Sequence, residues 1–117
     1  MDNKGEVGKL GERLAAEFLR EQGWNILVRN YRYHRVEIDI VAEDAGELVF
    51  VEVKTRDSLR FGEPEESVTP RKEENIRRAA EGYCIQYGLT DRFYRFDVLA
   101  VRLMPRTTVI KHLHNAF

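Results

Sequence analysis

Hydrophobic residues near the start of the chain recur every three or four positions, the spacing that is typical of an amphipathic helix. The first stripe predicts a helix over residues 5–22, with Gly23 as its C-terminal stop. A second stripe predicts another helix, with Thr69 as N-cap and Pro70 at the first helical position. The apolar positions are Val7, Leu10, Leu14, Ala15, Phe18 and Leu19 in the first helix and Ile76, Ala79, Ala80, Tyr83, Cys84 and Tyr87 in the second.

The remaining apolar runs are rich in β-branched and aromatic residues, which is typical of strands. They cover residues 24–33, 36–42, 47–54, 93–103 and 107–113. The stretch from Arg56 to Ser67 contains Gly62 and Pro64 and predicts a loop. The predicted order is α-β-β-β-α-β-β. This order favours a single domain, residues 1–117, of the broad α/β class. More narrowly it is an α+β fold, with a mixed central sheet flanked by helices.

Charged residues interrupt two of these strand patterns. Glu37 and Asp39 lie in the second run, and Glu52 and Lys54 lie in the third. If the two runs form an antiparallel hairpin that turns at residues 45–46, Asp39 lies opposite Glu52 and Glu37 lies opposite Lys54. Residues two apart share a face of a strand, so the four side chains would form one polar cluster.

This cluster permits two interpretations. It could be the solvent-exposed face of an edge hairpin, with Glu37 and Lys54 as a cross-strand ion pair. Alternatively it is a divalent-metal site, because buried charges are costly unless they are paired or bind a metal. Two carboxylates with a lysine beside them are the equipment of a metal-dependent phosphodiesterase.

Composition narrows the classes of function. The net charge is −1 and the pI is about 6.3, so a nucleic-acid surface would have to be a local basic patch. Cys84 is the single cysteine, which excludes an intramolecular disulfide and argues against a zinc site built on several thiolates. No run is long and apolar enough to span a membrane, and the first residues show no signal-peptide pattern. We therefore expect a cytoplasmic protein without a membrane partner.

Several further groups of polar residues each have two interpretations. The basic residues form either nucleic-acid surfaces or solvated faces. Asp97 more often pairs with an arginine such as Arg95 than binds a metal, and His112 and His114 fit a tail better than a metal site. The basic groups are Arg29, Arg32, His34 and Arg35, interleaved with Tyr31 and Tyr33, and then Arg56, Arg60, Arg71, Lys72, Arg77 and Arg78.

Taken together, the motifs resemble the PD-(D/E)xK nuclease superfamily. The closer resemblance is to the YraN-type family of small bacterial predicted endonucleases, and a more distant one is to archaeal Holliday-junction resolvases. The segments that carry it are residues 8–19 with Glu12, 37–42 with Asp39, 49–56 with Glu52 and Lys54, 61–64, and 67–69 followed by Lys72. The resemblance implies a restriction-endonuclease-like core and a Mg²⁺- or Mn²⁺-dependent endonuclease acting on DNA, including branched DNA.

The resemblance also implies roles for particular residues. Asp39 and Glu52 would ligate the metal together with the backbone carbonyl of Val53. Glu12 would reach the same ion directly or through water. Hard divalent cations prefer such oxygen ligands.

Around these ligands, Lys54 would orient or deprotonate a water or stabilise charge on the phosphate, and Glu37 would be its outer partner. The residues expected to contact nucleic acid are Arg32, Arg35, Arg56 and Lys72. Two other functions remain open: a nucleic-acid-binding protein with little or no activity, and an interaction module whose polar cluster is only an ion-pair network. The apolar strands near the C-terminus also leave a homodimer open.

Overall fold

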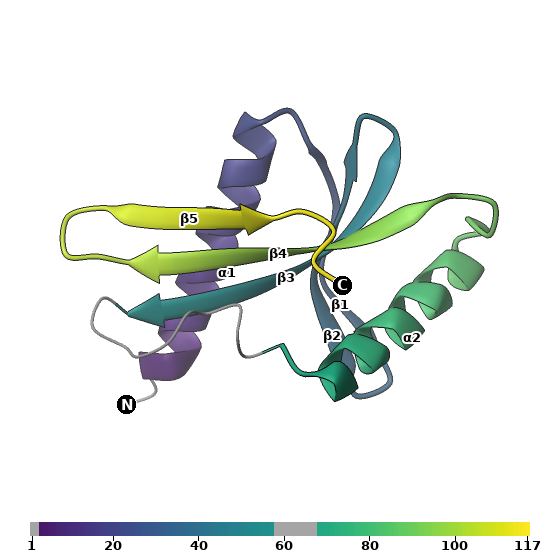
Figure 1. Cartoon of the computed structure of the whole chain (residues 1–117), viewed down its shortest axis with the longest axis horizontal. Helices are drawn as coiled ribbons and strands as arrows, with labels where there is room; N and C mark the ends of the chain where they lie inside the picture. The colour runs from purple at the N-terminus through teal and green to yellow at the C-terminus, as the bar shows by residue number, and fades with distance from the viewer. Residues whose placement is uncertain (1–2, 58–67) are drawn as a thin grey trace.

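The computed structural model describes residues 3–57 and 68–117 and has the helix and strand order that the sequence predicts (Figure 1). Within these residues, two helices accompany one five-stranded sheet. The elements are α1 (Asn3–Glu21), β1 (Asn25–Tyr33), β2 (Val36–Asp44), β3 (Glu47–Asp57), α2 (Pro70–Gln86), β4 (Tyr94–Leu103) and β5 (Thr108–Leu113).

The sheet is mixed, as predicted. Its strands lie in the order β1-β2-β3-β4-β5, and β3 and β4 are parallel while the other neighbours are antiparallel. Parallel neighbours need a crossover connection, and α2 belongs to the crossover between β3 and β4. This connection carries α2 across one face of the sheet (Figure 1).

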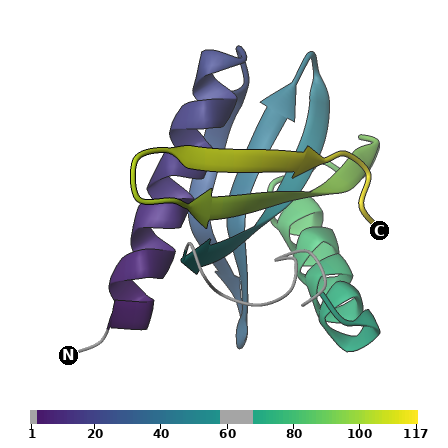
Figure 2. The same ribbon diagram turned by 60° about the vertical axis from the view of Figure 1, so that its left-hand side comes forward.

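The two helices cover opposite faces of the sheet (Figure 2). Alternate residues of β3 show this division, because successive side chains of a strand point to opposite faces. Val49 and Val51 pack in the core cluster that contains Leu19 of α1. Leu48 and Phe50 pack in the cluster that contains the buried residues of α2. Each face of the sheet is therefore covered by its own helix.

Two glycines allow the helices to lie close to the sheet. A Cβ on Gly11 of α1 would lie 1.9 Å from Oγ1 of Thr55, and one on Gly82 of α2 would lie 2.2 Å from Cε1 of Tyr33. Both distances are far below any contact that a Cβ can make, so only glycine permits this packing. As a result, the residue after Gly11, Glu12, lies next to the sheet.

Several local expectations are confirmed and others are wrong. Thr69 is the N-cap of α2 and accepts a hydrogen bond from the Lys72 backbone N–H at 3.2 Å. Tyr87, predicted on the apolar face of α2, follows the helix and is 51% exposed. The predicted loop is wrong at Arg56, because β3 continues to Asp57. The rest of that loop, residues 58–67, lies outside the described residues.

Candidate active site

The β2–β3 hairpin has the register that the sequence predicts. Its ladder runs from the pair Asp44 and Glu47 to the pair Ile40 and Val51. Beyond this pair the two strands separate: β2 continues along β1 as far as Val36, whereas β3 continues along β4 to its end. The strands therefore form a fork that begins immediately after Ile40 and Val51.

The predicted cluster lies at this fork, but its geometry differs from a ladder. Asp39 and Glu52, and likewise Glu37 and Lys54, are not paired residues, so this part of the prediction is wrong. Instead, Oδ2 of Asp39 accepts a hydrogen bond from the backbone N–H of Val53 at 2.8 Å. The carboxylate thus bridges the two strands where their ladder has ended.

The pleat of β2 also changes at Asp39. Ile38 packs in the core cluster on the α2 side, whereas Ile40 packs in the cluster on the α1 side. Residues two apart normally share a face of a strand, so the backbone turns between these two positions. Opposite this point in β1, Asn30 has φ of 56°, in the left-handed region that asparagine tolerates better than most residues. The turn brings the Asp39 side chain into the fork between the faces.

Glu52 lies between two ammonium groups. It is only 5% exposed, and its Oε2 lies 3.3 Å from Nζ of Lys54 and 2.5 Å from Nζ of Lys72. Lys54 follows it on the same face of β3, and Lys72 comes from the first turn of α2, which Thr69 caps. The crossover helix therefore supplies a cation to a carboxylate of the central strand.

Glu12 approaches the fork from α1. Its Oε1 accepts a hydrogen bond from Nδ2 of Asn30 at 2.9 Å. The sequence analysis did not select Asn30. The only signal for it was an asparagine within a strand, a residue type that strands disfavour. Asn30 both makes the turn in β1 and holds the helix-one carboxylate.

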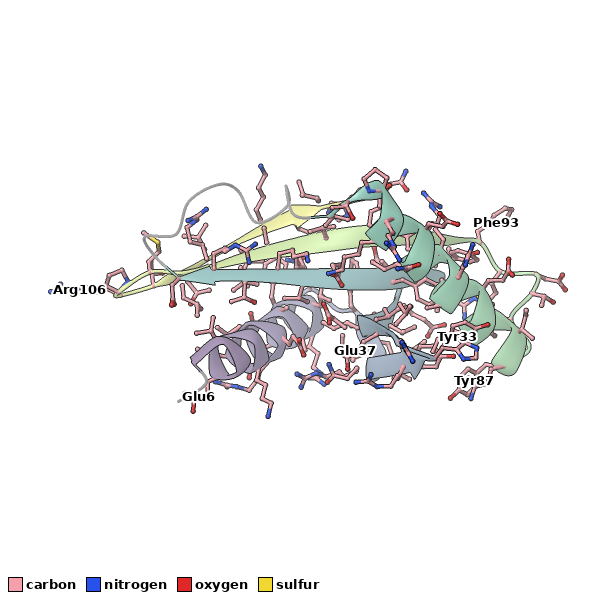
Figure 3. The ribbon with its side chains drawn as sticks, turned by 90° about the horizontal axis from the view of Figure 1, so that it is seen from below. Glu6, Tyr33, Glu37, Tyr87, Phe93 and Arg106 are labelled. Atoms are coloured by element: carbon pink, nitrogen blue, oxygen red, sulfur yellow. The ribbon has the colours of Figure 1, made fainter. Side chains whose placement is uncertain are left out.

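A pocket of about 540 Å³ lies at the fork, and both helices and both strands of the hairpin contribute residues to its lining. Its size is typical of ligand sites. In Figure 3, Glu37 lies between α1 and α2. The lining residues are Glu12, Arg35, Val36, Glu37, Asp39, Glu52, Val53, Lys54, Thr69, Arg71, Lys72, Asn75 and Ile76.

Comparison with known proteins places this chain in a family. The model for uncharacterised protein family UPF0102 matches residues 11–101. The chain belongs to the UPF0102 family. This is the YraN-type family that the sequence motifs resemble, so the expected family is confirmed.

Relatives in this family match the chain along almost its whole length. A UPF0102 protein of Chlorobaculum parvum is 51% identical over 119 residues, which cover 95% of this chain and 91% of the relative. One of Caldicellulosiruptor saccharolyticus is 43% identical over 117 residues, covering 98% and 99%. One of Dictyoglomus turgidum is 44% identical over 119 residues, covering both chains in full. The family is described as uncharacterised, so membership leaves the activity to be argued from the site.

Burial and the acidic surroundings in this UPF0102 pocket raise the pKa of Asp39. Burial, followed by the charge of Glu52, raises the pKa of Asp39 to about 8, and Glu12 adds to the rise. A hydrogen bond between the side chains of Asp39 and Glu52 acts in the same direction. Although they are not a ladder pair, the two carboxyl groups therefore meet. A cation or a proton between them is electrostatically required.

The two lysines respond to the same surroundings in opposite ways. Burial lowers the pKa of Lys54, and the nearby Lys72 lowers it further. Burial also acts to lower the pKa of Lys72, but the hydrogen bond to Glu52 outweighs it and the pKa is raised. Lys72 is therefore the firmly charged partner of Glu52, and Lys54 is the amine that releases a proton more readily.

The other predicted residues are divided between the pocket and the surface. Glu37 lines the pocket, but its ion pair is with Arg32 at 3.7 Å, which corrects the expected partnership with Lys54. Arg35 lines the pocket, whereas the side chain of Arg32 is 66% exposed. Arg56 lies outside the lining and donates a hydrogen bond from Nη1 to the carbonyl of Thr55 at 2.9 Å.

The structure also bears on the membrane expectation. Neither helix in residues 3–57 and 68–117 has the length and hydropathy needed to cross a lipid bilayer.

Proposed function

We propose that this UPF0102 protein is a metal-dependent phosphodiester hydrolase that cuts nucleic acid, with DNA as the expected substrate. The observation that carries the proposal is the meeting of two buried carboxyl groups, Asp39 and Glu52, with two lysines in one open pocket. Perturbed titratable groups in a cleft are a physical mark of a functional site.

The residues present fit a divalent metal. The donors that would hold Mg²⁺ or Mn²⁺ are the carboxylates of Asp39, Glu52 and Glu12 and the carbonyl of Val53, all of which line the pocket. Oxygen ligands of this kind suit hard cations. The ammonium of Lys72 lies 2.5 Å from Glu52, so a cation is already accommodated beside this carboxylate. When bound, such a metal lowers the pKa of its water and polarises a phosphoryl oxygen.

The remaining residues have roles that follow from their positions. Lys54, whose pKa is lowered by burial, is suited to accept a proton from the attacking water or to stabilise charge on the phosphate. Lys72 and Arg71 lie in the first turn of α2, where the helix dipole favours an anion. Arg35 also lines the pocket, immediately before β2. We assign phosphate binding to these three cations.

In this proposal, Arg32 and Arg56 contact the nucleic-acid strand outside the pocket. Both lie on strands that line or adjoin the pocket region, and with a net charge of −1 the chain depends on local basic residues to attract a polyanion. A cytoplasmic location and a homodimer that makes paired cuts belong to the same proposal.

A second function is favoured by one observation. Glu52 is already balanced by Lys54 and Lys72 without a metal. A nucleic-acid-binding protein that lacks catalysis would keep such an ion-pair network. Binding without cleavage would identify this alternative.

The test is a cleavage assay on four-way junctions, flaps, single strands, duplexes and RNA, each with Mg²⁺ or Mn²⁺. We expect metal-dependent cleavage of at least one substrate. The variants Glu52→Gln and Lys54→Met should lower its rate by about 10²-fold or more, since each removes a group that stabilises developing charge.

Glu17→Gln is the matched control, because this α1 residue forms only an exposed ion pair with Arg13 in the described structure. It should leave the rate unchanged. Cleavage that survives in Glu52→Gln and Lys54→Met, with both proteins shown to be folded, would assign the activity elsewhere. Salt-dependent binding with no cleavage in any protein would favour the binding function instead.

A further inference from the structure

A second polar cluster lies on the other face of the sheet. Asp97 of β4 is fully buried, and Leu99, two residues further on, packs in the α1-side core. Glu52 points to the α2 side, so the two clusters are separated by the sheet itself. His112 of β5 and His114 after it complete the second cluster. His112 is 8% exposed, so the expectation of a tail is wrong for it.

Three ligand atoms of this cluster converge. Nε2 of His112 lies 2.8 Å and Nδ1 of His114 lies 3.6 Å from Oδ2 of Asp97. One ligand atom from each of the three residues lies within 4.8 Å of those of the other two. Ligands that share one ion at bond lengths of about 2.0–2.2 Å must lie within about 4 Å of each other. Small side-chain movements therefore suffice to bring the three atoms around one centre.

We propose that Asp97, His112 and His114 bind one divalent transition-metal ion of the Zn²⁺, Co²⁺ or Ni²⁺ class. Two imidazole nitrogens and a carboxylate oxygen are ligands that suit these ions and not Mg²⁺, which prefers oxygen alone. Water would complete the coordination. The site would be separate from the fork pocket in both position and ligand chemistry, and the inference does not rest on the proposed function.

Asp97 is the buried member of a group of carboxylates around Arg95. The guanidinium of Arg95 is shared by three carboxylates: Asp97 at 3.0 Å, Asp44 at 3.2 Å, and Glu47. Asp44 and Glu47 are 36% and 41% exposed, so Asp97 is the member of this group that is withdrawn from water. A divalent ion bound here would join Arg95 as a second cationic partner of the buried Asp97 carboxylate.

The two histidine rings differ in how firmly the surrounding residues hold them. The ring of His112 lies against Trp24 and Phe18, with centroid distances of 5.4 Å and 6.3 Å, and this packing fixes its orientation. His114 stacks on His112 with centroids 3.7 Å apart and is 60% exposed. A turn of the exposed His114 ring directs its nitrogen to the ion, while His112 exchanges its hydrogen bond to Asp97 for a metal bond.

The bound ion would fasten the C-terminal segment to the sheet. The backbone N–H of Asn115 already donates to Oδ1 of Asp97 at 2.9 Å, and that of Ala116 donates to the carbonyl of Phe96 at 2.7 Å. An ion held by β4, β5 and the residue beyond β5 would link all three. Its role is therefore structural, and its binding energy would appear as folding stability.

The test is a Co²⁺ titration followed by visible absorption and by calorimetry, with excess Mg²⁺ present to occupy the fork pocket. We expect one Co²⁺ per chain with nitrogen-ligand absorption bands. His114→Ala should weaken its affinity by at least about 100-fold, since loss of a ligand exceeds the effect of losing an outer partner. Zn²⁺ should raise the melting temperature of the wild type and not that of His114→Ala.

His34→Ala is the matched control, because His34 is the remaining histidine of the chain and is exposed at the β1–β2 turn. It should bind Co²⁺ like the wild type. The same titration of Asp39→Asn/Glu52→Gln removes the fork pocket as a source of signal. Absence of the bands in the wild type, or equal Co²⁺ affinity in wild type and His114→Ala, would overturn the proposal and leave a hydrogen-bonded Asp–His pair.

Discussion

Asp39 and Asp97 are both buried carboxylates of central strands, yet their pKa values move in opposite directions. The hydrogen bonds that Asp97 accepts from His112, Arg95 and the backbone of Asn115 outweigh the effect of burial and lower its pKa. Asp39 accepts one of its hydrogen bonds from a backbone N–H, but burial and acidic neighbours raise its pKa to about 8. Burial is common to both, so the partners decide the outcome.

The comparison separates a structural carboxylate from a reactive one. A buried charge that has cationic and N–H partners stabilises a unique arrangement of the chain. A buried carboxyl group that faces other carboxyl groups in an open pocket can ionise only at a cost, unless a cation binds beside it. The repulsion between Asp39 and its acidic neighbours, and not the burial of Asp39, supports a cation site at the fork.

The largest expected effect is on folding. Asp97→Ala should lower the free energy of unfolding by about 3–5 kcal/mol, because it leaves the Arg95 guanidinium without its buried partner. Asp39→Asn should leave the free energy of unfolding at pH 9 unchanged or raise it, since it removes a repelled charge. Urea denaturation of both variants measures this, and a large loss of stability in Asp39→Asn would break the distinction between the two residues.

The position of α1 is the next test. Gly11→Ala should lower the free energy of unfolding by about 1–3 kcal/mol, because its Cβ would overlap Thr55. Gly8→Ala is the control on the same helix, where a Cβ meets nothing within 4 Å. That change should raise stability by up to about 1 kcal/mol through helix propensity. If Gly11→Ala folds, the shift of Glu12 away from the fork should also reduce the rise in the Asp39 pKa.

The raised pKa of Asp39 predicts how metal binding depends on pH. Below pH of about 8 the ion must displace one proton, so Mg²⁺ affinity should rise about tenfold per pH unit and then level off. Calorimetry of the wild type and Asp39→Asn measures the slope. A slope that persists in Asp39→Asn would show that another group holds the proton.

The same shifts predict opposite pH dependences of stability. The pKa of Asp39 is higher in the folded chain, so its contribution is fully present below its unfolded value of 3.8 and is lost as pH rises through about 8. The pKa of Asp97 is lower in the folded chain, so its contribution is present above 3.8 and is lost as pH falls through its folded value. Urea denaturation across pH, with Asp39→Asn beside the wild type, separates the two.

The smallest expected effect concerns Lys72. Its ammonium competes with a metal for Glu52, so Lys72→Met should raise Mg²⁺ affinity by no more than about tenfold, the value of one charged hydrogen bond at a half-exposed site. The same change should weaken binding to nucleic acid. Lys9→Met, on the exposed side of α1, is the control. Lower Mg²⁺ affinity in Lys72→Met would show that the lysine supports the ion instead of replacing it.

Local chemistry explains what the sequence could predict. The hairpin register followed from the turn, where Ala45 and Gly46 both have positive φ, 52° and 86°, as the favoured two-residue turns require. The helix caps and the apolar faces of the helices also depend only on residues that are close together in the sequence. The pairing of Asp97 with Arg95, two residues away, was also confirmed.

What the sequence could not predict depends on residues that are distant along the chain. The fork after Ile40 forms where β2 follows β1 and β3 follows β4. The sequence of the hairpin alone does not show where its two strands separate. Asn30 and Glu12 meet only because Gly11 allows α1 to approach. The metal and catalytic roles of the fork residues stay predictions, because they depend on ligands and substrates.

The crossover through α2 has a consequence for how the protein folds. Asp39 and Glu52 belong to a meander of neighbouring strands, which forms through local contacts, whereas Lys72 arrives only when the long connection to β4 closes. Parallel pairing of this kind is the slow part of folding. The two carboxylates and Lys54 therefore meet before Lys72 arrives, and a divalent ion or a low pH should speed refolding by relieving the remaining carboxylate repulsion at that stage.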